Sequence, residues 1–173
     1  SPGRGKIKFF ERLRQHINRP DAPQTIREVM KMEQGNALLQ FVHKNAEMGK
    51  GIIPQVLEVV EEPRLRSALQ GQLNEYEAIA GRAEHLMQQR GMVPSEAGEM
   101  REFMSGMMIR AKTLTDRSPS RIAEMMIQGS TMGAIQMTRR LHSCEAADAE
   151  ALLLAHKLLR TEENNIEQMK DFL

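Results

Sequence analysis

Residues 36–91 read NALLQFVHKNAEMGKGIIPQVLEVVEEPRLRSALQGQLNEYEAIAGRAEHLMQQRG, and this stretch decides the fold. Apolar residues recur at helical spacing on both sides of Glu62-Pro63, a pattern typical of two amphipathic helices joined by a tight turn. We expect the first helix to start at Asn36 as its N-cap, to bend near Pro54 and to end at about Glu61. Because the turn is so short, the two helices must run antiparallel. The inward positions of the second helix are Leu65, Leu69, Gln72 or Leu73, Tyr76, Ile79, Ala83 and Leu86.

The stretch from 118 to 173 repeats this organisation. It opens with an N-cap and a proline at Ser118-Pro119. Met132-Gly133 follows Met48-Gly49 by 84 residues, and on the return helices Glu162 follows Glu75 by 87 residues. The difference predicts a longer turn within residues 143–148. The chain is therefore expected to contain two related helical hairpins.

Residues 92–117 connect the two hairpins and carry apolar residues at helical spacing, which predicts a further helix at about 95–115. The predicted fold is all-α: an antiparallel four-helix bundle made of two helical hairpins joined by a crossover with an extra helix. Residues 36–173 would form this bundle domain. Residues 1–35 would form a basic N-terminal helical appendage.

Two hairpins with a helical crossover resemble the ferritin-like four-helix-bundle superfamily. In that superfamily two helices contribute a Glu each, and the other two contribute Glu-x-x-His, to bind a di-iron centre. The corresponding positions here read Glu75-Tyr76-Glu77-Ala78 and Glu162-Glu163-Asn164-Asn165, so neither motif contains the histidine. The resemblance therefore implies the ferritin-like fold with a degenerate or absent di-iron motif.

The sharpest candidate site pairs Glu75 with Glu162, which both fall at mid-height in the predicted bundle. A buried, unpaired carboxylate costs several kcal/mol, so a buried pair would share a proton or bind one cation. Two alternatives stay open: both glutamates reach solvent at the edge of the apolar stripe, or they belong to a structural polar network. The polar residues expected around this centre are Asn45, Gln72, Tyr76 and Asn165.

Near the N-terminus, basic residues surround an apolar helical face, and we interpret this face as a candidate docking surface. It consists of Phe9, Phe10, Leu13 and Ile17. The alternatives are that this face packs back on the bundle, or that residues 6–18 lie on an anionic membrane surface.

Composition excludes several classes of function. A net charge of +1 argues against a general nucleic-acid binder. The single cysteine, Cys144, cannot form an internal disulfide, and no apolar run is long enough to span a bilayer, so a cytoplasmic protein is expected. The fourteen methionines follow the apolar stripes, which favours a methionine-rich core over soft-metal ligands.

No catalytic signature is present, so the sequence predicts a non-catalytic bundle that acts as a homo-oligomer or binds a protein partner. No cofactor is expected. The alternative is a bundle that binds a metal or small ligand, with a possible redox role. In that case Glu75 and Glu162 would hold a single metal ion or ligand at the centre of the bundle.

Overall fold

The computed structural model describes residues 8, 11–12, 14–15, 24–95 and 98–173. The described part of the chain is helical and contains no strand. Its helices are α2 (Gln24–Leu57), α3 (Pro63–Gln89), α4 (Gly98–Lys112), α5 (Pro119–Ser143) and α6 (Ala149–Lys170). The all-α prediction is therefore confirmed. None of these helices is both long and apolar enough to cross a membrane.

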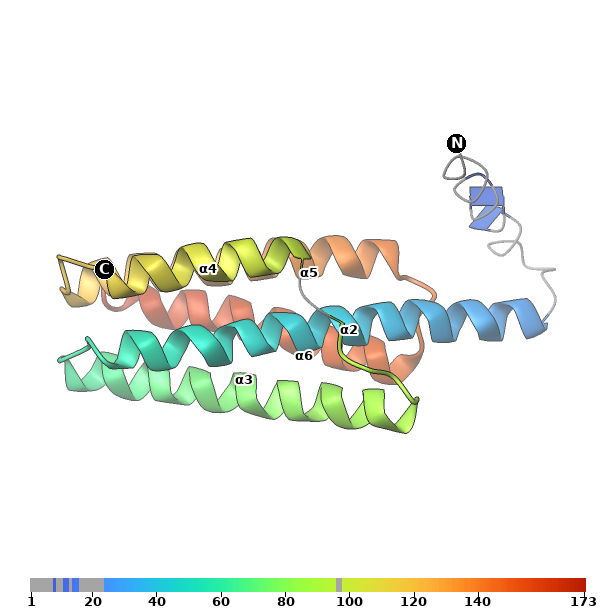
Figure 1. Ribbon diagram of the computed structural model, residues 1–173, viewed down its shortest axis with the longest axis horizontal. Helices are drawn as coiled ribbons and strands as arrows, with labels where there is room; N and C mark the ends of the chain where they lie inside the picture. Colours follow the sequence, from blue (N-terminus) through green and yellow to red (C-terminus); the bar gives the residue numbers. More distant parts are fainter. Residues whose placement is uncertain (1–7, 9–10, 13, 16–23, 96–97) are drawn as a thin grey trace.

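The helices pack as two hairpins, α2 with α3 and α5 with α6, and α2 and α6 form the main contact between them. α4 packs along α2 (Figure 1). The apolar stripes of the helices meet in one core, in which burial of each large side chain contributes about 1.5–3 kcal/mol. The most deeply buried large side chains are Leu38, Leu39, Ile53, Leu65, Leu69, Ile79, Leu86, Met87, Ile122, Met137, Leu158 and Met169.

Three helices begin with the caps that the sequence provides. The Glu62 carboxylate accepts a hydrogen bond from the Leu65 backbone N–H, and Pro63 occupies the first turn of α3. The hydroxyl of Ser118 caps α5 in the same way. Asp148 caps α6 by accepting from the backbone N–H of Ala151 at 3.2 Å. These caps satisfy N–H groups that have no partner inside a helix.

The predicted helix start at Asn36 is wrong, because α2 runs without a break from Gln24 to Leu57. The boundary expected between residues 35 and 36 thus falls inside one helix. Gly35 is buried against the α5–α6 turn, and a Cβ atom there would lie only 1.7 Å from Oδ1 of Asp148. Asn36 accepts a hydrogen bond from Arg90 at 3.1 Å. Both residues therefore serve a tertiary contact and not a helix end.

Arg90 holds this contact together from the end of α3. Its guanidinium donates two hydrogen bonds to the Asp148 carboxylate, at 2.9 and 2.7 Å. The pairing lowers the pKa of Asp148, chiefly through these hydrogen bonds from Arg90. The turn between α5 and α6 is consequently fixed to both helices of the first hairpin.

The return helices of the two hairpins match at a different offset from the predicted one. The N-caps of the return helices are Glu62 and Asp148, and the separation between them, 86 residues, is also that between Tyr76 and Glu162. At this offset six buried positions of α3 coincide with buried positions of α6, whereas an offset of 87 pairs buried Leu69 with exposed His156 and buried Tyr76 with exposed Glu163. The buried pairs are Leu65 with Ala151, Leu69 with Ala155, Gln72 with Leu158, Tyr76 with Glu162, Ile79 with Asn165 and Ala83 with Met169.

Candidate functional site

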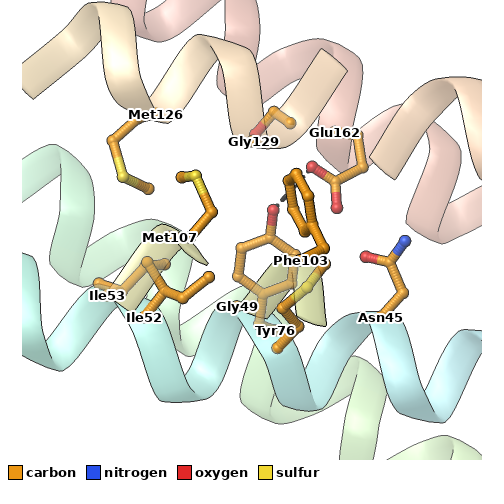
Figure 2. Close-up of a pocket in the computed structure, with 12 residues that line it drawn as sticks. Asn45, Gly49, Ile52, Ile53, Tyr76, Phe103, Met107, Met126, Gly129 and Glu162 are labelled. Carbon is orange, nitrogen blue, oxygen red and sulfur yellow. Dashed lines mark hydrogen bonds between the residues drawn. The ribbon is translucent and has the colours of Figure 1, made fainter. Parts of the chain in front are cut away.

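A buried polar cluster lies between the two hairpins at mid-height. Glu162 on α6 is 2% exposed, and its carboxylate accepts a hydrogen bond from the Tyr76 hydroxyl of α3 at 2.7 Å. Asn165, one turn further along α6, donates its side-chain N–H to the same hydroxyl at 3.2 Å. Ser130 of α5 hydrogen-bonds to this pair through its side chain. Figure 2 shows the tyrosine hydroxyl and the carboxylate pointing toward one another.

Burial controls the protonation of this cluster. Removal from water raises the pKa of Glu162 to about 7, although the hydrogen bonds from Tyr76 and Ser130 act in the opposite direction. Burial also raises the pKa of Tyr76 well above its usual range, and the neighbouring Glu162 adds to that rise. The carboxyl group can therefore gain or lose a proton near neutral pH, while the phenol stays protonated.

Two glycines at equivalent positions of the hairpins make room for the two central side chains. A Cβ atom at Gly49 would lie 2.5 Å from Cδ2 of the Tyr76 ring. A Cβ atom at Gly133 would lie 2.9 Å from Oε1 of Glu162. Any larger residue at either position would push the central side chain aside.

A cavity of about 30 Å³ adjoins the cluster. Its polar end includes Glu162, Tyr76 and Ser130 together with Asn45 of α2, which is 2% exposed. The side-chain nitrogen of Asn45 has no hydrogen-bond partner among the residues that the structure describes, and in Figure 2 the amide points toward the carboxylate. The remaining lining residues are Met48, Gly49, Ile52, Ile53, Phe103, Met107, Met126 and Gly129.

α4 lies over this cavity and supplies Phe103 and Met107 to its wall (Figure 2). Where α4 packs on the bundle, methionine side chains of α4 lie over a glycine of α2 and a glycine of α5. A Cβ atom at Gly51 of α2 would lie 2.5 Å from the terminal methyl of Met104. At Gly129 of α5 it would lie 3.3 Å from the terminal methyl of Met107. The methionine ends therefore occupy the space that missing side chains leave.

The structure brings together only part of the predicted site. Glu162, Tyr76, Asn45 and Asn165 meet at the centre, but Glu75 is exposed on α3 and does not line the cavity. The expected pair of glutamates does not form, because the register places the residue after Glu75 opposite Glu162. The oxygen group opposite Glu162 at this level is thus a phenol and not a carboxylate.

Gln72 is buried, but it lies outside the cavity. Its side-chain N–H donates to Gln168 at 2.8 Å, and its side-chain oxygen has no partner within the described part of the chain. Ser130 was missing from the predicted site, although its spacing from Met126 and Gly133 placed it on the inward stripe of α5. The candidate docking residues Phe9, Phe10, Leu13 and Ile17 lie outside the described residues.

In the part of the chain that the structure describes, no group of three or more His, Cys, Asp or Glu side chains is placed to hold a metal ion. The centre offers one carboxylate, one phenol, one hydroxyl and amide groups. Comparisons of the chain with protein-family models, with curated proteins and with solved structures found no match.

Proposed function

We propose that this protein binds one small polar ligand at the centre of its helical bundle, in the cavity next to Glu162. The observation that carries the proposal is the side-chain N–H of Asn45, which is buried, lacks a partner and belongs to a residue of the cavity wall. Leaving such a donor unsatisfied costs about 1–3 kcal/mol. A ligand that accepts its hydrogen bond would recover that free energy.

The surroundings of Asn45 support the same proposal. Glu162 is a buried acidic group that is bonded to a neutral phenol, and its burial disfavours the charged form. Gly49 and Gly133 let the Tyr76 and Glu162 side chains enter the centre, although glycine inside a helix costs about 0.5–1 kcal/mol relative to alanine. These features reduce the stability of the fold, and a ligand bound to Asn45 and Glu162 would offset part of that cost.

The arrangement that would present this ligand is ferritin-like in our proposal: two hairpins in contact through α2 and α6, with α4 on the connection between them. The alternative ligand is a single metal ion bound to the Glu162 carboxylate, which would not accept the hydrogen bond of Asn45. Glu75 has no part in either form, because it lies on the exposed side of α3.

The proposal is tested by nuclear magnetic resonance of protein labelled at its methionine methyl groups. Met48, Met107 and Met126 line the cavity, whereas Met137 and Met169 are buried outside it and serve as internal controls. The probes are ethanol, ethylammonium, acetate and magnesium chloride. We expect at least one of them to shift the lining methyl signals saturably and to leave the control signals unchanged. No saturable shift with any probe would contradict the proposal.

The Gly129→Ala variant sharpens this experiment. The added methyl group would enter the wall of the cavity beside Met107, whose flexible end can move by a few tenths of an ångström. The variant should therefore fold, with a small gain in helix stability of up to about 1 kcal/mol. It should bind the successful probe at least tenfold more weakly, because the cavity is partly filled.

A second candidate function is association through the beginning of α2, which extends past the ends of the other helices (Figure 1). Ile26, Val29 and Met32 are exposed there by 37%, 54% and 43%. Neighbouring apolar side chains in water favour contact with a partner surface. We propose a second copy of this chain as that partner, and the molar mass in solution tests it.

A further inference from the structure

We infer that the ligand of the central cavity is a short aliphatic compound with a hydroxyl group, held by Asn45 and Glu162. This inference rests on the proposed function and adds the chemical class of the ligand. It follows from the groups that the cavity leaves without partners and from the residues of its walls.

The polar end of the cavity presents one donor and one acceptor. The N–H of Asn45 needs an acceptor, since it has no partner in the structure. The Glu162 carboxylate already accepts from Tyr76, and it has capacity for further donors. A hydroxyl group both donates and accepts, so a single oxygen atom could satisfy Asn45 and bind Glu162 together. The Tyr76 hydroxyl itself is occupied, because it donates to Glu162 and accepts from Asn165.

Other small head groups fit this pair less well. An ammonium group carries only donors, so it would leave the N–H of Asn45 unsatisfied and bring a charge into an apolar interior. A carboxylate would satisfy Asn45, but it would meet the like charge of ionised Glu162. A hydroxyl group also remains a partner when Glu162 is protonated, because the acid can then donate to the oxygen.

The rest of the cavity sets the size and character of the attached chain. Ile52, Met107 and Met126 form an apolar wall that suits carbon and offers no hydrogen bond. The volume of about 30 Å³ is about two to three times the roughly 10–15 Å³ that a single water needs. The cavity is therefore large enough only for a compound of two or three heavy atoms. Ethanol is the simplest probe with this composition.

The test compares ethanol with ethylammonium, which also has three heavy atoms, and with acetate, which has four, by titration of the methionine methyl signals at pH 7. A ligand of three heavy atoms cannot bind much more tightly than about 1 mM, so each titration extends to about 300 mM. We expect ethanol to bind at least about tenfold more tightly than either ion, since each ion leaves one polar group unsatisfied or meets a like charge.

Asn45→Leu removes the donor at nearly constant volume and should weaken ethanol binding by about tenfold or more. Gln72→Leu is the matched control, because Gln72 is also buried with an unpartnered atom but does not line the cavity. It should bind ethanol as the parent does. If Asn45→Leu does not fold, Asn45→Ala tests the same donor.

The outcomes separate this inference from the proposed function. Tighter binding of ethylammonium or acetate than of ethanol would overturn the hydroxyl inference and leave a ligand site in place. Unchanged ethanol binding in Asn45→Leu would overturn it as well. Failure of all the probes, magnesium included, would overturn the proposed function itself and leave a cavity that holds water only.

Discussion

Glu162 is an acid in an apolar interior, and its protonation must be linked to folding. In the unfolded chain its pKa returns to the ordinary value of 4.5, while in the folded protein burial raises the pKa to about 7. The folded protein therefore holds this proton more tightly. Unfolding becomes easier as pH rises from about 4.5 to 7, and above that range the contribution has been lost.

We predict that this linkage lowers the free energy of unfolding by about 3 kcal/mol between pH 4.5 and pH 8. Glu162→Gln should remove that part of the pH dependence, because its amide does not titrate. Urea denaturation of both proteins at several pH values gives the difference. The exposed Glu75→Gln variant is the control and should follow the parent. If the free energies of unfolding of the parent and of Glu162→Gln differ by the same amount at pH 4.5 and at pH 8, the acid keeps an ordinary pKa.

Gly35 gives a second prediction for a single residue. Gly35→Ala should destabilise the protein by about 1–3 kcal/mol, because its new methyl group would collide with the Asp148 carboxylate that Arg90 holds in place. Gly71→Ala is the control, since a Cβ atom there meets nothing within 4 Å, and it should stabilise the protein by up to about 1 kcal/mol. Thermal denaturation distinguishes the two. Equal stabilisation by both alanines would mean that the turn moves freely away from α2.

At the scale of helices, the sequence predicted which helices are present and in what order better than it predicted where each helix begins and ends. The starts at Pro63 and Pro119 followed from local caps, and both are confirmed. The start at Asn36 was wrong because a glycine followed by an asparagine can mark a close tertiary contact as well as a helix boundary. Here Gly35 packs against Asp148, which is distant in sequence. Local pattern cannot separate these cases when the deciding contact is remote in sequence.

The centre of the bundle shows the same limit. Glu162 and Tyr76 could be predicted as inward residues from their helical spacing. Their pairing depended on an offset of one residue between the hairpins, which the caps Glu62 and Asp148 define. The unpartnered state of Asn45 and the position of α4 depend on three-dimensional packing. No pattern within a single helix contains that information.

The end of Met104 on α4 lies over Gly51 of α2, so the contact between these helices can be altered without touching the centre. Gly51→Leu should displace Met104 and increase backbone hydrogen exchange in residues 98–112 by about tenfold. Gly106→Ala lies on α4 itself, where a Cβ atom meets nothing within 4 Å, and should slow that exchange. Unchanged exchange in Gly51→Leu would mean that other contacts hold the helix.

At the scale of the whole molecule, the projecting start of α2 is the surface that we propose binds a second copy. Val29→Lys would place a charge among Ile26 and Met32 and should lower the molar mass measured by light scattering after size exclusion. Leu153→Lys is the control, because Leu153 is a single exposed apolar residue on α6. A parent protein that is monomeric at every concentration would end this second proposal.

The chain contains one tyrosine and no tryptophan, and that tyrosine is Tyr76, bonded to Glu162 at the centre. The five phenylalanines absorb at shorter wavelength, so emission excited in the tyrosine band arises from a single phenol beside the proposed ligand. Ionisation of its carboxylate partner should change the emission intensity, and so should any guest molecule that rearranges the cluster. The protein consequently carries an optical reporter of its own interior, which no added dye or engineered chromophore needs to supply.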